Sequence, residues 1–175
     1  MRPAADRCHT SGMYTSSADL PWPVPDPRAR HWAGQFSDMR TIVEPLKIPQ
    51  SLPVNVQRLF ETCRELLRFS YYHLEFGPAA VYTSITAVEA ALRERYQGRN
   101  LNEMIGTALA DGTLTAEQAD RLHAGRQIRN RYSHGRTMHP AMAIPFAVQL
   151  VVVALEVVAL LDTSDSGEDV GTHPA

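Results

Sequence analysis

The chain has 175 residues, of which 44% are hydrophobic and 21% are charged, values typical of a single soluble globular domain. Its formal net charge of -2 excludes a protein that is basic throughout, although a local basic surface is compatible with that total. The two cysteines, Cys8 and Cys63, exclude a disulfide framework, and the N-terminus lacks the pattern of a signal peptide, so we expect a cytoplasmic location.

Residues 1–52 predict a disordered start followed by an irregular, proline-rich arm. Ser, Thr and Gly dominate the first twenty or so residues, which is typical of disorder, and Met13 is an alternative start to Met1. Prolines at every second position from 21 to 27 exclude a regular helix or a central strand. Trp32 and Phe36 are expected to pack on the body of the protein, and a short helix over about 29–44 is weakly indicated.

Residues 53–162 predict an all-α domain, a bundle of about four to five helices. Apolar residues recur with a period of 3.6 from Val56, and Cys63 falls on their buried stripe. Gly77-Pro78 separates the first helix from the second, and Thr115 forms a capping box with Gln118. The later helices are expected at about 78–96, 101–110, 115–132 and 140–161, followed by an acidic tail, 163–175, that we expect to be disordered.

The last predicted helix is almost entirely apolar, because Gln149 and Glu156 are its strongly polar residues. It approaches the length of a membrane span, yet Pro145 and these two polar residues interrupt it. A helix that is apolar on all sides is usually central in a bundle or buried in a dimer interface. We therefore expect a core or dimer-interface helix, and a membrane-tethered protein remains the weaker alternative.

Positive charge is concentrated in the second half of the chain. No Asp or Glu occurs between residues 121 and 155, a window that holds five arginines and three histidines. Guanidinium groups bind phosphate oxygens in pairs of hydrogen bonds, which favours RNA as the partner. The arginines that we expect to contact RNA are Arg126, Arg131 and Arg136.

The sequence Arg129-Asn130-Arg131-Tyr132-Ser133-His134 carries the candidate chemistry. Histidine transfers protons near neutral pH, and arginine stabilises the charge that develops on a phosphodiester during cleavage. Helical spacing places Arg126, Asn130 and His134 along one stripe, with Arg129 beside it, and turns Ala124, Ile128 and Tyr132 towards the core. No metal-ligand spacing or glycine-rich phosphate loop occurs, so we expect neither a metal nor a cofactor.

The Arg-Asn-x-x-x-His pattern near the end of a helical domain resembles the signature of HEPN domains, over about residues 53–161. This resemblance implies catalytic roles for Arg129, Asn130 and His134, and a homodimer in which two motifs meet. It also implies a metal-independent endoribonuclease in a toxin–antitoxin or anti-phage system, with an antitoxin or other defence protein as partner. In some toxins of this family a modified tyrosine lies two positions after the histidine, where this chain has Arg136.

Some members of the family bind without cleaving, so the rival hypothesis is a non-catalytic helical interaction or dimerisation module. Arginines near the end of a helix often only solvate the surface, and a histidine before glycine is an ordinary helix end. Enzymatic activity is favoured by the asparagine after Arg129 and by the absence of acidic residues around the motif.

Overall fold

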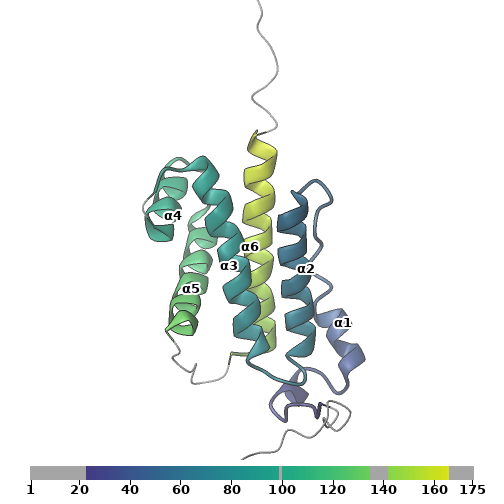
Figure 1. Cartoon of the computed structure of the whole chain (residues 1–175). Coiled ribbons are helices and arrows are strands. Elements are labelled where there is room, and N and C mark those ends of the chain that lie inside the picture. The colour runs from purple at the N-terminus through teal and green to yellow at the C-terminus, as the bar shows by residue number, and fades with distance from the viewer. Residues whose placement is uncertain (1–22, 99, 135–141, 166–175) are drawn as a thin grey trace, which may run out of the picture.

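A computed structural model describes residues 23–98, 100–134 and 142–165, and every regular element in these residues is a helix (Figure 1). The α-helices are α1 (Met39–Ile42), α2 (Val54–Phe69), α3 (Phe76–Arg95), α4 (Leu101–Ala110), α5 (Ala116–Ser133) and α6 (Ile144–Asp165). Two 3₁₀ turns, Ala29–His31 and Phe36–Asp38, precede them. The predicted all-α class is confirmed: α2 to α6 match the four to five helices expected for the bundle, and α1 lies in the arm, within the range 29–44 where a short helix was weakly indicated.

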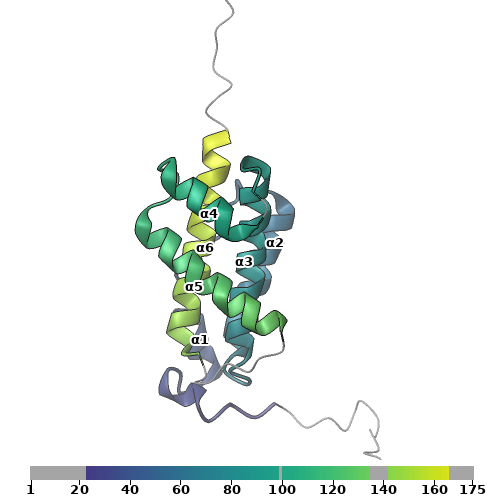
Figure 2. The same cartoon turned by 90° about the vertical axis from the view of Figure 1, so that its left-hand side faces the viewer.

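Helices α2, α3 and α6 lie side by side and form the body of the bundle (Figure 1). Helix α5 packs obliquely against α3 and α6, and α4 lies across one end of α5 (Figure 2). Helix α3 therefore contacts α2, α4, α5 and α6. Three of its small residues, Ala80, Ser84 and Ala87, are buried and allow its neighbours to approach closely.

Helix α6 supplies much of the hydrophobic core. Among the described residues, those of α6 form a helix that is long and apolar enough to cross a membrane. In this structure 61% of its apolar stretch is buried within the protein, against α2, α3 and α5. The helix begins at Ile144 rather than near Pro140, which lies outside the described residues. It continues to Asp165, past its expected end at about residue 161 and into the segment expected to be disordered.

The expectation that Gly77-Pro78 separates two helices is wrong, because α2 ends at Phe69 and both residues lie in the first turn of α3, where a proline is tolerated. Other local signals act as expected. Thr115 and Gln118 make a reciprocal capping box at the start of α5. Helix α4 has the predicted bounds and is followed by Gly112, whose φ of 82° suits a residue without a side chain. Cys63 is buried as expected, and burial raises the pKa of its thiol to about 12.

The proline-rich arm is tied to the bundle by Asp26. Its carboxylate accepts hydrogen bonds from the Arg28 side chain and backbone and from the Leu74 backbone N–H, and its own N–H donates to the Tyr71 carbonyl oxygen. These bonds join the arm to the loop between α2 and α3. Apolar residues of the arm then enter the common core: Ala29, Ala33, Met39, Val43, Leu46 and Leu52. Residues 1–22 and 166–175, where we expect disorder, lie outside the described residues.

Helices α3 and α5 approach each other closely at Gly125. A Cβ atom at this position would lie 2.5 Å from Cδ1 and 2.9 Å from Cγ1 of Ile85. Both separations are shorter than van der Waals contact allows, so the crossing needs a residue without a side chain. This close approach brings the C-terminal half of α5 against α3.

Candidate functional site

The candidate site lies where α4, α5 and α3 meet, in a surface depression that we call the α4–α5 hollow. Its volume is about 300 Å³. Residues from three helices line it: Glu89 of α3, Asn100, Leu101 and Asn102 at the start of α4, and Arg126, Arg129 and Asn130 of α5. Three residues singled out from the sequence therefore share one hollow.

Two local structures hold the α4 side of the hollow in place. The Asn100 side chain caps α4 by accepting the Glu103 N–H, and its amide group donates to the Glu103 carboxylate. At the other end of α4, the Tyr96 hydroxyl lies 2.7 Å from Asp111 and 2.9 Å from Thr113 in hydrogen-bonding contact. Burial raises the pKa of Tyr96, while the Thr113 backbone N–H lowers that of Asp111. The end of α3 is thereby joined to the turn that leads into α5.

Arg129 is held by an ion pair with Glu89. Its Nη2 atom lies 2.6 Å from Oε2 of Glu89, while the other carboxylate oxygen of Glu89 accepts a hydrogen bond from Arg93 at 2.8 Å. The Glu89 side chain is only 16% exposed, so this interaction is screened less than a typical surface ion pair. Glu89 was not identified from the sequence, because its partner lies 40 positions away on another helix.

Arg126 differs from Arg129 in its surroundings. Its Nε atom is buried and has no hydrogen-bond partner among the described residues. It also makes no ion pair within the described part of the chain, so its charge is not neutralised by a direct contact there. The hollow thus contains one arginine with an acidic partner and a second whose buried N–H is unsatisfied.

His134 lies at the C-terminal end of α5, outside the residues that line the hollow. It is exposed, and its backbone N–H donates to the Asn130 carbonyl oxygen at 3.2 Å, one turn back. In an α-helix five residues correspond to a rotation of about 140°, so Arg129 and His134 leave the helix in different directions. One copy of the chain therefore does not bring its own Arg129 and His134 together on the same side of α5.

Of the other residues predicted from the sequence, some lie on the surface of α5 and one lies outside the described residues. Arg131 is exposed on α5, away from the hollow, and Arg136 lies outside the described residues. Ile128 is buried as expected, but the expectation that Tyr132 faces the core is wrong. Tyr132 is 45% exposed, and its ring packs at a tilt of 40° against Tyr82 of α3, with centroids 5.6 Å apart.

The error at Tyr132 comes from the direction of the buried stripe on α5. The buried residues follow a spacing of three, at Ala119, Leu122, Gly125 and Ile128, rather than a spacing of four. Each step of three turns the stripe by about 60° around the helix, as expected when α5 crosses its neighbours obliquely (Figure 2). Sequence periodicity alone does not give this crossing angle.

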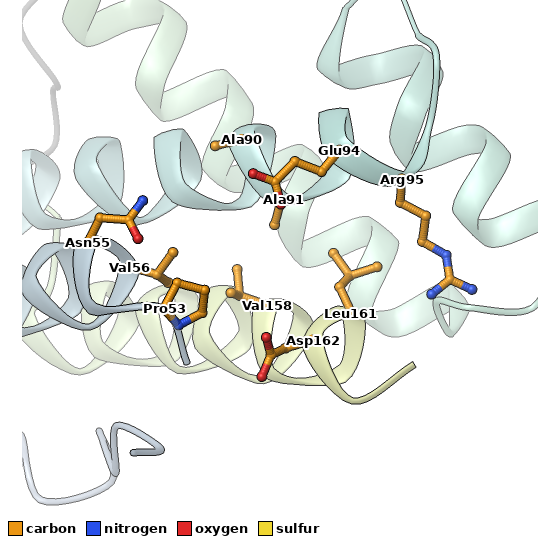
Figure 3. A pocket seen from close by; sticks show the side chains of 10 residues that line it. All are labelled: Pro53, Asn55, Val56, Ala90, Ala91, Glu94, Arg95, Val158, Leu161 and Asp162. Atoms are coloured by element: carbon orange, nitrogen blue, oxygen red, sulfur yellow. The ribbon is translucent and has the colours of Figure 1, made fainter. Parts of the chain in front are cut away.

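A second pocket lies away from the motif, between the start of α2 and the ends of α3 and α6 (Figure 3). Its volume is about 150 Å³, and its apolar wall includes Val56, Val158 and Leu161. Asn55, Glu94, Arg95 and Asp162 supply its polar groups. Within residues 23–98, 100–134 and 142–165, no group of three His, Cys, Asp or Glu side chains is placed to hold a metal ion.

Comparisons of this chain with protein-family models, curated proteins and solved structures found no match.

Proposed function

We propose that the protein is a cytoplasmic RNA-binding protein that cleaves RNA without a metal ion and acts as a homodimer. The observation that carries this proposal is the meeting of Arg126, Arg129 and Asn130 in one hollow, with His134 exposed one turn beyond Asn130. A cationic hollow beside an accessible imidazole supplies both phosphate binding and proton transfer.

The proposed reaction is a transesterification within the RNA strand. His134 accepts the proton of the ribose 2′-hydroxyl as the 2′-oxygen attacks phosphorus, or it donates a proton to the leaving 5′-oxygen. The bond between phosphorus and the 5′-oxygen breaks, giving a 2′,3′-cyclic phosphate and a 5′-hydroxyl. Arg129 offsets the negative charge on the phosphoryl oxygens, and Asn130 orients the phosphate or the imidazole by hydrogen bonding.

A dimer would complete this site. Each motif supplies one arginine and one histidine, and cleavage needs both side chains at the same phosphate. Arg129 and His134 of one copy also point about 140° apart around α5. Two copies related by a two-fold axis would place His134 of one against Arg129 of the other. Exposed Tyr132 near the end of α5 and Phe146 near the start of α6 are apolar groups that such an interface could cover.

The biological setting that we propose is toxin–antitoxin or anti-phage defence. This setting follows from the resemblance of the Arg-Asn-x-x-x-His pattern to HEPN domains, together with the all-α fold. An antitoxin or other defence protein is then the expected partner, because a ribonuclease acting on cellular RNA must be restrained in the cell that makes it.

A non-catalytic interaction module is the second candidate, and the Glu89–Arg129 ion pair is the observation that favours it. A guanidinium already neutralised by a carboxylate at 2.6 Å is less available to a phosphate. In that case the motif would serve the packing of α5 on α3. A membrane-tethered protein is the weakest candidate, since anchoring through α6 would withdraw a mostly buried helix from the core.

The test is cleavage of total RNA and tRNA in excess EDTA by wild type, His134→Ala and Arg129→Ala. We expect wild type to cut and to leave 2′,3′-cyclic phosphate ends, and both variants to lose activity by at least about 100-fold. Circular dichroism would verify that the variants are folded.

Two matched variants provide controls outside the proposed site. His31→Ala removes an exposed histidine of the arm, and Arg121→Ala removes an α5 arginine that pairs with Glu117. Both should cut like wild type. Absence of cleavage by folded, dimeric wild type would favour the interaction module, and equal cleavage by His134→Ala would rule out this histidine as the catalytic group.

A further inference from the structure

Within the α4–α5 hollow, Arg126 is the cationic group that no protein contact accounts for. Its Nε–H is buried without a partner among the described residues, although buried donors in folded proteins are nearly always satisfied. Arg129 beside it is bound to Glu89, which in turn is bound to Arg93. A guanidinium of fixed charge that lines the hollow and has no acidic partner among the described residues favours a ligand with oxygen acceptors.

The start of α4 adds further donors to the same hollow. Leu101 and Asn102 are the first two residues of this helix, and the first N–H groups of a helix lack acceptors within it. The Asn102 side chain is exposed, and Asn130 contributes a second amide from α5. Guanidinium, backbone N–H and side-chain amide groups are the donors that most often bind nucleic-acid phosphates.

Two carboxylates stand near these donors and weaken the attraction for an anion. Glu89 lines the hollow, and Glu103 lies in the first turn of α4. Each is engaged: Glu89 by Arg93 and Arg129, and Glu103 by the Asn100 amide. With Arg93, Arg126 and Arg129 against Glu89 and Glu103, this group keeps a positive balance of one charge.

We propose that the α4–α5 hollow is a binding subsite for an RNA backbone phosphate that flanks the scissile phosphate, with Arg126 as its principal ligand. This inference rests on the proposed ribonuclease function. Arg126 and Arg129 are three residues apart on α5, a rise of about 4.5 Å along a helix, so a strand whose scissile phosphate lies at Arg129 presents a neighbouring phosphate to Arg126. The subsite would fix the position of the strand, and hence the cleavage position, while Arg129 and His134 act on the neighbouring linkage.

The first test measures single-stranded RNA binding as a function of salt, in the His134→Ala background so that RNA stays intact. Arg126→Gln should weaken binding about tenfold and lower the slope of log affinity against log salt by about 0.7, the value for one lost phosphate contact. Arg121→Gln, on the same helix but paired with Glu117, should change neither quantity. Arg126→Lys keeps the positive charge but loses the planar guanidinium. It should therefore keep the salt-dependence slope of wild type and weaken affinity less than Arg126→Gln does.

The second test locates the phosphate by replacing single linkages with neutral methylphosphonates. One replacement beside the cleavage position should weaken binding by about tenfold in protein that keeps Arg126, and should have no effect in Arg126→Gln. If Arg126→Gln binds with the affinity and slope of Arg121→Gln, the subsite is overturned, while cleavage dependent on His134 would leave the ribonuclease proposal standing.

A third arm separates failure of the subsite from failure of the function. If wild type neither binds nor cuts RNA, the ribonuclease proposal and the RNA assignment both fail. Pyrophosphate is then added in thermal unfolding of Arg121→Gln and Arg126→Gln. Stabilisation of the first variant alone would show that the hollow takes the phosphate of another ligand. Stabilisation of neither would overturn the phosphate site altogether.

Discussion

Arg129 of α5 and Glu89 of α3 form an ion pair of 2.6 Å at the wall of the α4–α5 hollow. The pair joins the proposed catalytic arginine to the helix that contacts most of the bundle. The same contact holds the guanidinium in one orientation and reduces its charge towards a phosphate. A substitution at Glu89 therefore distinguishes a catalytic role of Arg129 from a purely structural one by its effect on RNA binding.

Replacing Glu89 with Gln should strengthen RNA binding by about three- to tenfold, because it removes a negative charge from the hollow and frees Arg129 for phosphate. The change is measured as the dissociation constant in the His134→Ala background at low and high salt, and the gain should shrink at high salt. Glu94→Gln, an exposed α3 carboxylate outside the hollow, is the control. Unchanged binding by Glu89→Gln would indicate that Arg129 serves packing rather than RNA.

Mixing two inactive variants should restore cleavage if the site is shared between copies. A dimer of one Arg129→Ala chain and one His134→Ala chain retains one intact pairing of Arg129 with the partner's His134. With random pairing and two sites in each dimer, about a quarter of wild-type activity is expected. Refolding the variants together, against each refolded alone, measures this recovery. No recovery from a mixture shown to contain heterodimers would place both residues of each site in one chain.

Gly125→Ala should destabilise the protein where α5 crosses α3. Replacing a helical glycine with alanine stabilises a helix by about 1 kcal/mol. At Gly125, however, the new Cβ would lie 2.5 Å from Cδ1 of Ile85 and force repacking that costs about 1–3 kcal/mol. Gly106→Ala on α4 is the matched control, because its Cβ would meet nothing within 4 Å and the helix gain should remain. Urea unfolding should separate the two variants by about 1–3 kcal/mol. Equal stabilities would contradict the close approach.

Asp26→Asn should lower the free energy of unfolding by about 1–3 kcal/mol at neutral pH, since a carboxylate that accepts several hydrogen bonds loses its charge. Hydrogen bonding from Arg28 holds the pKa of folded Asp26 well below its usual 3.8. As pH falls below 3.8, Asp26 of the unfolded chain takes up a proton before Asp26 of the folded chain does. The stability that the Asp26 charge contributes is therefore lost progressively as pH approaches the folded pKa. The difference between wild type and variant should therefore narrow below about pH 4.

Unfolding measured between pH 7 and pH 3 tests this dependence. Asp120→Asn, at an exposed position of α5, should change stability by less than about 0.5 kcal/mol throughout. A difference for Asp26→Asn that stays constant with pH would show that hydrogen-bond geometry, rather than charge, holds the arm.

Local signals in the sequence predicted most of the helices but not all of their bounds, and they did not predict the tertiary contacts. The bounds of α4 and the Thr115–Gln118 capping box were predicted because caps and glycines act within a few residues. The spacing of Arg126 and Asn130 likewise placed them in one hollow. Exposure of Tyr132 and the pairing of Glu89 with Arg129 depend on how α5 crosses α3, which is set by packing across 40 residues of chain.

Packing of the arm against α6 has a consequence for the order of folding. Pro45, Lys47 and Pro49 of the arm share a surface pocket with Val152, Leu155 and Ala159 of α6, about one hundred residues later in the chain. During synthesis the arm leaves the ribosome first. The α6 residues against which it packs are made last, so the apolar side chains of the arm stay exposed until then. Contacts so distant along the chain slow folding and leave apolar segments open to aggregation. A nascent chain stalled before α6 should therefore depend on chaperones until its final helix is made.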